Sequence, residues 1–185
     1  MSEEANFETD FLELNHLENQ LEEGEWSGLI SEGSIFGIVV SRFNSEITAR
    51  LLEGAKKACA EKKIKQVVIF HVPGAVEIPL ALQACAKLGI FHALIALGAV
   101  IRGETTHYDY VCEQVSAGCQ QVMLEHHLPV IFGVLTTEND AQALARSGGD
   151  MGNKGAEAVE AACEMVSLMM SIDQMEEALK SEQEI

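Results

Sequence analysis

The stretch Ala93-Leu94-Ile95-Ala96-Leu97-Gly98-Ala99, residues 93–99, decides the fold class of this chain. It is unbroken and apolar, which is typical of a strand buried on both faces of a parallel sheet. Further largely apolar runs lie before and after it, at 35–40, 67–72 and 129–135. We therefore predict four strands, of which 93–99 is the third.

Segments with helical periodicity separate these strands. In each of them the apolar residues share one helix face. These faces are Ile47, Leu51, Ala55 and Cys59 in the first helix, Val111, Val115, Gly118, Cys119 and Val122 in the third, and Val159, Cys163, Val166 and Met170 in the last. The alternation predicts an α/β fold in which helices cover both faces of a parallel sheet.

Local signals place the remaining helices. Asn44 is a favourable residue for capping the first helix. The second helix is predicted over 77–88, with Pro79 in its first turn. Thr137 together with Asp140 resembles the capping box of a further short helix.

Charge divides the chain into three parts. The 185 residues include 12 basic and 29 acidic ones, a net charge of −17, which argues against a nucleic-acid partner. Residues 1–32 hold ten acids and no Lys or Arg, and residues 171–185 hold five acids and one Lys. We therefore predict an acidic N-terminal extension (1–32), a nearly neutral domain (33–170) and an acidic C-terminal tail (171–185).

The N-terminal extension allows two interpretations. Its apolar residues recur at helical spacing, which predicts an amphipathic helix that docks on a partner or on the domain. The alternative is a loosely ordered, solvated arm. The apolar residues concerned are Phe7, Phe11, Leu14, Leu17 and Leu21.

Several sequence features favour a cytoplasmic location. Five cysteines without a C-x-x-C pair form a poor disulfide or zinc framework, so we expect buried, reduced thiols in a reducing compartment. The N-terminal residues lack the basic and apolar regions of a signal peptide. No stretch approaches the ~20 apolar residues of a membrane span.

Ligands of parallel α/β sheets bind beyond the carboxyl ends of the strands. The richest loop there is 98–107. Its Gly103 permits close approach to a ligand, its Thr105 lies beside a helix N-terminus that attracts anions, and its His107 is suited to proton transfer. The alternative is an ordinary helix cap with a surface histidine.

Three further residues are candidates, each with an alternative role. Phe43 is either a stacking platform for a flat ring or a core aromatic. Glu77 either accepts hydrogen bonds from substrate hydroxyls or complements the helix dipole. Arg146 and Lys154 are the only cations in 139–170, and Arg146 is either an anion clamp or a solvated helix-end residue.

Two kinds of bound group are disfavoured. Adjacent side chains diverge on a helix, so His126 and His127 beside Glu125 are not expected to bind a metal. The chain has neither G-x-G-x-x-G nor a P-loop, which disfavours a nucleotide cofactor.

Several long motifs, in order and suitably spaced over about residues 33–170, resemble the 6,7-dimethyl-8-ribityllumazine synthase family. The motifs are Arg42-Phe43-Asn44, Val72-Pro73-Gly74-Ala75-Val76-Glu77-Ile78-Pro79, Gly98-Ala99-Val100-Ile101-Arg102-Gly103-Glu104-Thr105-Thr106-His107-Tyr108, Pro129-Val130-Ile131-Phe132-Gly133-Val134-Leu135-Thr136-Thr137-Glu138 and Gly152-Asn153-Lys154-Gly155. Their coincidence is a stronger signal than any one of them.

The resemblance implies a reaction and an assembly. The family condenses 5-amino-6-(D-ribitylamino)uracil with 3,4-dihydroxy-2-butanone 4-phosphate in the penultimate step of riboflavin synthesis, without a metal or organic cofactor. Its fold is a flavodoxin-like three-layer α/β/α sandwich with a four-stranded parallel sheet. Its members form pentamers, some of which assemble into icosahedral shells, and their active sites lie between subunits.

The resemblance also implies roles for single residues. His107 transfers protons, and the other residues bind substrate. Phe43 stacks on the pyrimidine, Asn44, Ala75, Val76 and Glu77 lie along the ribityl chain, Ala99, Val100 and Ile101 hold the ring edge, Glu104, Thr105 and Arg146 bind phosphate, Phe132 closes the site from the adjacent subunit, and Lys154 lies near the polar edge of the ring.

Some questions stay open from sequence. Val76 stands where many relatives carry a larger residue, and the acidic extension is not part of the family pattern. Alternative functions are a pentameric riboflavin synthase and a shell or lumazine-binding protein without turnover. The assembly is a pentamer, a decamer or a 60-mer, and riboflavin synthase is a candidate partner.

Overall fold

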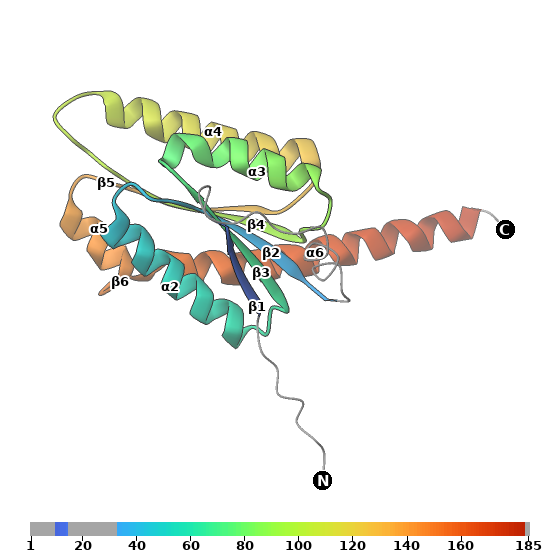
Figure 1. Ribbon diagram of the computed structural model, residues 1–185. Helices are drawn as coiled ribbons and strands as arrows, with labels where there is room; N and C mark the ends of the chain where they lie inside the picture. The colour runs from blue at the N-terminus through green and yellow to red at the C-terminus, as the bar shows by residue number, and fades with distance from the viewer. Residues whose placement is uncertain (1–9, 15–32, 184–185) are drawn as a thin grey trace, which may run out of the picture.

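The computed structural model describes residues 10–14 and 33–183, which form five parallel strands between two layers of helices (Figure 1). The strands are β1 (Asp10–Leu14), β2 (Ile35–Ser41), β3 (Gln66–Val72), β4 (Ala93–Ile101) and β5 (Val130–Thr137). The helices are α2 (Ser45–Glu61), the 3-10 turn η1 (Ala75–Glu77), α3 (Ile78–Lys87), α4 (His107–His126), α5 (Asp140–Arg146) and α6 (Lys154–Gln183). A small antiparallel pair, β6 (Ser147–Gly149) and β7 (Gly152–Asn153), precedes α6. The four predicted strands are confirmed.

The order of the strands in the sheet is β1-β3-β2-β4-β5, with every neighbouring pair parallel. From β2 the chain crosses to β3 on one side, and it then returns to β4 and β5 on the other. The direction of winding therefore reverses between β2 and β4. A crevice forms outside the carboxyl ends at such a switch point, so this topology predicts where a ligand binds.

Two apolar cores lie on the two faces of the sheet because successive strand residues point to opposite sides. In β2, Ile38 packs with α2, α5 and α6, whereas Val39 packs with α3 and α4. Figure 1 shows the same division into layers. The three-layer α/β/α sandwich predicted from the alternating pattern is confirmed.

The predicted inward faces are mostly confirmed. All four residues named for α2 are buried, as are Val115, Cys119 and Val122 in α4. In α6 the buried stripe stops at Val166, and Met170 is 54% exposed. α6 nevertheless continues to Gln183 and projects beyond the sheet (Figure 1), so most of the predicted acidic tail is a continuation of this helix.

Part of the N-terminal extension contributes a fifth strand. β1 pairs in parallel with the outer edge of β3, from Asp10 opposite Gln66 to Leu14 opposite Phe70. Leu12 packs against the core on the α3–α4 face. The helical prediction is therefore wrong for residues 10–14, because β3 offers a free row of backbone hydrogen-bonding groups that a strand can pair. The rest of the predicted helix, including Phe7, Leu17 and Leu21, lies outside the described residues.

Two local predictions also need correction. The helix predicted over 77–88 is preceded by the 3-10 turn η1, which ends at Glu77, so α3 itself starts one residue later, at Ile78. The N-cap of α5 is Asn139, whose side chain accepts a hydrogen bond from the amide of Gln142. Thr137 instead ends β5, and its hydroxyl donates to the carbonyl of Asn139. The strand continues two residues beyond the predicted 129–135 run, which displaces the cap along the chain.

Candidate active site

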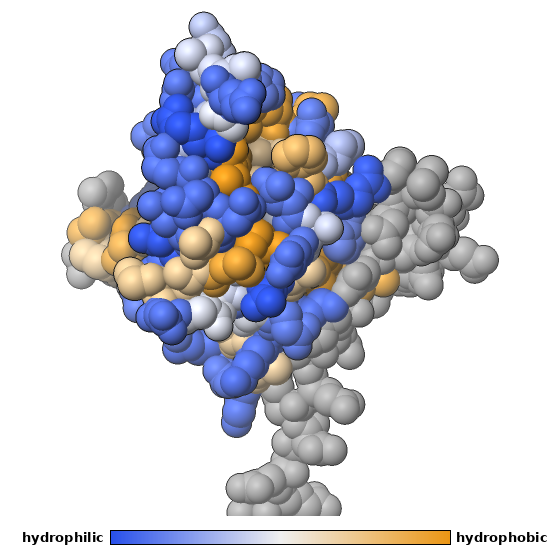
Figure 2. All heavy atoms as spheres, turned by 90° about the vertical axis from the view of Figure 1, so that its left-hand side faces the viewer, coloured by the Kyte–Doolittle hydropathy of each residue, from blue (hydrophilic) through white to orange (hydrophobic). Residues whose placement is uncertain are grey.

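A hollow of about 670 Å³, called here the main hollow, opens at the carboxyl ends of β2 and β4, where the topology places a ligand. Figure 2 looks onto the end of the molecule that is at the left in Figure 1, where α4 and α5 begin. That face is largely hydrophilic, with apolar side chains gathered near its middle. Ten predicted residues line the main hollow: Phe43, Asn44, Ala75, Val76, Glu77, Ala99, Val100, Ile101, Thr105 and His107.

Phe43 lies in the loop after β2 and is 70% exposed, so it is not a core aromatic. Backbone hydrogen bonds tie this loop to the end of β3: the amide of Arg42 donates to the carbonyl of Val72, and that of Phe43 to the carbonyl of Pro73. An exposed aromatic ring on a fixed backbone can stack on a planar ligand.

Asn44 occupies the N-cap of α2 but does not cap it with its side chain. Its backbone is left-handed, with φ at 57°, a conformation that Asn tolerates better than most residues. Nδ2 instead donates a 2.9 Å hydrogen bond to the carbonyl of Ala99. The predicted cap is therefore corrected: the side chain joins the ends of β2 and β4 across the switch point.

The turn after β3 presents a carboxylate to the main hollow. η1 carries Ala75, Val76 and Glu77, and Ala75 is buried while the other two are exposed. Glu77 makes no side-chain capping bond to α3, and Oε2 lies back toward Gly74. The carboxylate is therefore open to a ligand, which favours a hydroxyl acceptor over a simple partner of the helix dipole.

The loop between β4 and α4 forms another wall. Ala99 and Val100 are buried, so only limited parts of them reach the main hollow, whereas Thr105 and His107 are exposed. The hydroxyl of Thr105 accepts a hydrogen bond from the amide of His107 at 3.4 Å, and Thr106 makes no side-chain cap. His107 is the first residue of α4, at a helix N-terminus that attracts anions. Glu104 is exposed in the same loop but does not line the main hollow.

Three predicted residues lie elsewhere. Phe132, Arg146 and Lys154 line a second hollow of about 400 Å³, called here the edge hollow, between β5 and the start of α6. Phe132 is 41% exposed on β5, which is the last strand of the sheet. The two hollows share no lining residue. One chain therefore separates this aromatic and cationic trio from the other predicted residues.

The two cations of the edge hollow are held by their own helices. Nη1 of Arg146 donates to the carbonyl of Gln142 at 3.1 Å, one turn earlier in α5. Lys154 forms an ion pair with Glu157 in the first turn of α6. Each bond fixes the direction of a side chain while leaving other donors of Arg146 for an anion.

Sequence reasoning gave no ligand-binding role to five residues of the main hollow, namely Gly74, Tyr108, Tyr110, Val111 and Gln114. Three of them follow His107 at the i+3, i+4 and i+7 positions, which share one face of a helix. Extending that face from His107 would have found them. Val111 belongs to the predicted core-facing stripe of α4 and also borders the main hollow.

Other groups contribute little chemistry. Burial raises the pKa of the Cys59, Cys85 and Cys119 thiols to about 12, so these thiols stay protonated and unreactive near neutral pH. Within 10–14 and 33–183, no cluster of three His, Cys, Asp or Glu residues is arranged to hold a metal ion. The same part of the chain contains no helix long and apolar enough to cross a membrane.

Comparison with known proteins gives consistent matches. The sequence profile of a family described as 6,7-dimethyl-8-ribityllumazine synthase matches residues 33–170. A protein of that name from Coxiella burnetii (strain RSA 493 / Nine Mile phase I) is 53% identical over 138 residues, which cover 74% of this chain and 91% of the relative. Those from Salinibacter ruber and Bdellovibrio bacteriovorus are 47% and 52% identical, over 78% and 74% of this chain and 94% and 75% of their own lengths.

Proposed function

The chain belongs to the 6,7-dimethyl-8-ribityllumazine synthase family, and from that premise we propose that the main hollow and the edge hollow are the two halves of its active site. It is a transferase of riboflavin biosynthesis. The reaction joins 5-amino-6-(D-ribitylamino)uracil to 3,4-dihydroxy-2-butanone 4-phosphate and yields the lumazine, phosphate and water.

The main hollow binds the ribitylaminouracil. Its size falls within the ~300–1,000 Å³ of ordinary ligand pockets. The exposed ring of Phe43 stacks on the pyrimidine, and backbone groups of Ala99, Val100 and Ile101 hold its edge. The carboxylate of Glu77 accepts hydrogen bonds from the ribityl hydroxyls, with Asn44, Ala75 and Val76 along the chain. The open carboxylate beside an exposed aromatic ring supports this assignment.

The phosphate of the second substrate binds near the start of α4. Thr105 and Glu104 provide donors from the loop, and the N-terminus of α4 favours an anion there. Arg146 supplies the compensating positive charge. The net charge of −17 does not argue against a phosphorylated substrate, because most of it belongs to residues 1–32 and 171–185 and the domain between them is nearly neutral.

His107 carries the protons. Imine formation, phosphate elimination and ring closure each require a proton to move, and one imidazole at the mouth of the main hollow can serve them in turn. Its exposure on the lining of that hollow supports this role. Much of the remaining rate acceleration comes from holding two substrates together.

Phe132, Arg146 and Lys154 reach the main hollow from a neighbouring copy of the chain. The single observation that carries this proposal is the division of the predicted residues between two hollows with no residue in common. Two different surfaces that pair in this way form a heterologous interface, which generates a ring when the rotation between copies closes and an open filament when it does not. We assign the ring as a pentamer, with decamers or 60-mers as higher assemblies.

Product analysis tests the activity. Purified protein is mixed with both substrates, and the lumazine is followed optically. Formation of lumazine supports the synthase. Conversion of added lumazine to riboflavin would identify the dismutating riboflavin synthase instead, and binding without conversion would identify a shell or lumazine-binding protein.

Subunit mixing tests the shared site. H107A and R146A variants are dissociated together and reassembled. If each site takes His107 from one copy and Arg146 from its neighbour, about a quarter of the sites in a random mixture regain both residues. The mixture then exceeds either variant assembled alone. Activity no higher than the mean of the two separate variants would rule out sharing.

Location and partners complete the proposal. The five cysteines, all free in the described part of the chain, support a reducing compartment, and we place the enzyme in the cytoplasm. A riboflavin synthase, which consumes the lumazine, is the proposed functional partner.

A further inference from the structure

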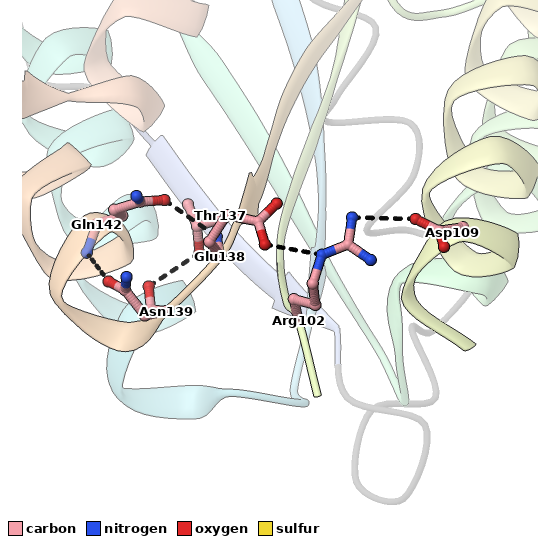
Figure 3. A network of polar contacts seen from close by, with 6 residues as sticks. All are labelled: Arg102, Asp109, Thr137, Glu138, Asn139 and Gln142. Carbon is pink, nitrogen blue, oxygen red and sulfur yellow. Dashed lines mark hydrogen bonds and ion pairs between the residues drawn. The ribbon is translucent and has the colours of Figure 1, made fainter. Parts of the chain in front are cut away.

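Arg102 follows β4 directly and does not line the main hollow. Its Nη2 lies 3.1 Å from Oδ1 of Asp109, in the first turn of α4. Its Nε lies 2.8 Å from Oε2 of Glu138, just after β5. Figure 3 shows the guanidinium reaching between these two carboxylates. Arg102 thus bridges two elements that are distant in sequence.

Two further contacts hold this residue. The guanidinium carbon lies 4.0 Å from the centroid of the Tyr108 ring, a cation–π distance. The Arg102 amide donates to the carbonyl of Thr137 at 2.9 Å, which fixes its backbone on the end of β5. Two carboxylates and the Tyr108 ring already engage the guanidinium, so the charge of Arg102 is balanced within the chain, although the residue lies in the loop predicted to bind phosphate.

The contacts of Arg102 stabilise the turn of helix that begins with His107. The N-cap residue Thr106 makes no side-chain hydrogen bond to this turn. Instead, Tyr108 and Asp109, the two residues after His107, are both held from outside the helix by Arg102. The orientation of the His107 side chain therefore depends on a residue that does not touch the main hollow.

Glu138 continues the network toward Arg146 through its backbone amide. The Glu138 amide donates to Oε1 of Gln142 at 3.0 Å (Figure 3), and the carbonyl of Gln142 accepts from Nη1 of Arg146 at 3.1 Å. A continuous series of ion pairs and hydrogen bonds thus leads from the first turn of α4 to the last residue of α5. One end of this series carries His107, and the other carries Arg146, which in the proposed assembly serves the site of a neighbouring copy.

We propose that Arg102 is a positioning residue of this enzyme: it holds the His107 turn of α4, in one active site, in register with the β5–α5 segment of the same chain, which carries Arg146 to the neighbouring site. This inference rests on the proposed function. A bidentate, planar guanidinium is needed because a lysine ammonium cannot bridge both carboxylates and also stack on Tyr108. The two ion pairs of Arg102 have separable effects: the pair with Asp109 serves proton transfer, and the pair with Glu138 serves phosphate binding.

Kinetics of Arg102→Gln and Arg102→Lys test the proposal. Both variants are expected to lower kcat about tenfold, since small misplacements of reacting groups cost up to ~100-fold. In the His107→Ala background, Arg102→Gln should change kcat less than about twofold, because the group it positions is gone. The matched control is Arg50→Gln, which removes an exposed ion pair with Glu46 on α2 and should leave kcat unchanged. Equal losses of kcat in both backgrounds would overturn the proposal.

The variants Asp109→Asn and Glu138→Gln test the two ion pairs of Arg102 separately. Asp109→Asn should lower kcat, whereas Glu138→Gln should mainly raise the KM for the phosphate substrate. The same KM and kcat changes in both variants would refute separate roles for the two ion pairs.

Hydrogen exchange of the assembled protein gives a readout independent of turnover. Arg102→Gln should speed exchange of the amides at 107–111, and Arg50→Gln should not. If the wild-type protein makes no lumazine, the proposed function fails, yet faster exchange at 107–111 in Arg102→Gln still supports the positioning role of Arg102. Unchanged exchange at 107–111 overturns the positioning role of Arg102 whether or not the enzyme is active.

Discussion

Nδ2 of Asn44 donates a 2.9 Å hydrogen bond to the carbonyl oxygen of Ala99. These residues are 55 positions apart, at the carboxyl ends of β2 and β4, the two strands between which the winding of the sheet reverses. The bond therefore spans the crevice in which the main hollow opens. It also uses the amide of a residue whose backbone is left-handed.

The first prediction concerns this bond. Asn44→Ala loses the hydrogen bond and places a Cβ-bearing residue without a polar side chain at φ 57°, so it should lower the free energy of unfolding by about 1–3 kcal/mol. Asn44→Gly keeps the backbone conformation and should lose only about 1 kcal/mol. Urea unfolding of both variants checks this. Equal destabilisation by Ala and Gly would contradict the contribution of the left-handed backbone.

The second prediction concerns His107. His107→Ala should slow turnover by ~10–100-fold without abolishing it, below or at the low end of the usual range for a general acid–base residue, because substrate positioning persists. Steady-state assays with saturating substrates measure this effect. Unchanged turnover would remove His107 from proton transfer.

The third prediction concerns Arg146. Arg146→Ala should raise the KM for the phosphate substrate by ~10–100-fold, as expected for loss of a charge-assisted hydrogen bond. The KM for the ribitylaminouracil should change little. Arg50→Ala, at an exposed position on α2, is the matched control. A normal KM for the phosphate substrate would count against the clamp.

The fourth prediction concerns Gly155, at the start of α6. A Cβ at this position would collide with the backbone carbonyl of Leu51 in α2, which cannot give way as a flexible side chain can. Gly155→Ala should therefore destabilise the fold by about 1–3 kcal/mol. Gly103→Ala, where no atom lies within 4 Å of the added Cβ, is the stability control. Thermal unfolding distinguishes them, and equal midpoints would show that α6 shifts without cost.

The fifth prediction concerns pH. Burial raises the pKa of Cys59, Cys85 and Cys119 from 9.0 to about 12, so the folded chain holds their protons where the unfolded chain releases them. This contribution to stability is fully present below pH 9 and is lost as pH rises from 9 to 12. The free energy of unfolding should fall by up to about 1.4 kcal/mol per pH unit for each thiol.

Urea unfolding between pH 8 and 10.5 measures that slope. Cys85→Ala removes one buried thiol and should make the decline shallower than in the wild type. Cys112→Ala, at a half-buried site, should alter the slope less. Parallel curves for all three proteins would show that the buried thiols do not contribute.

Hydrophobic periodicity was enough to predict the strands and helices whose buried face is set by local geometry. The strand at 93–99 and the inward face of α2 follow from alternation and helical spacing, because burial of one face imposes the same pattern wherever the segment packs. The loops of the main hollow also followed, since the carboxyl ends of parallel strands meet at one edge. The roles of the residues in those loops stay predictions.

Other features needed partners that are remote in the sequence. Spacing within 10–14 does not distinguish a helix from a strand, and only the free edge of β3 made this segment β1. Asn44 is a good cap by residue type, yet the carbonyl of Ala99 took its side chain. In both cases a long-range hydrogen-bonding group outweighed a local preference.

By itself, the sequence determined an α/β sheet, the loops at its carboxyl ends and the family to which the chain belongs. Only the tertiary structure decided that Phe132, Arg146 and Lys154 lie in a different hollow from His107, and that Arg102 joins Asp109 to Glu138. The physical reason is that spacing along the chain specifies which face of an element a residue occupies. The order of strands in the sheet specifies which residues of different elements meet.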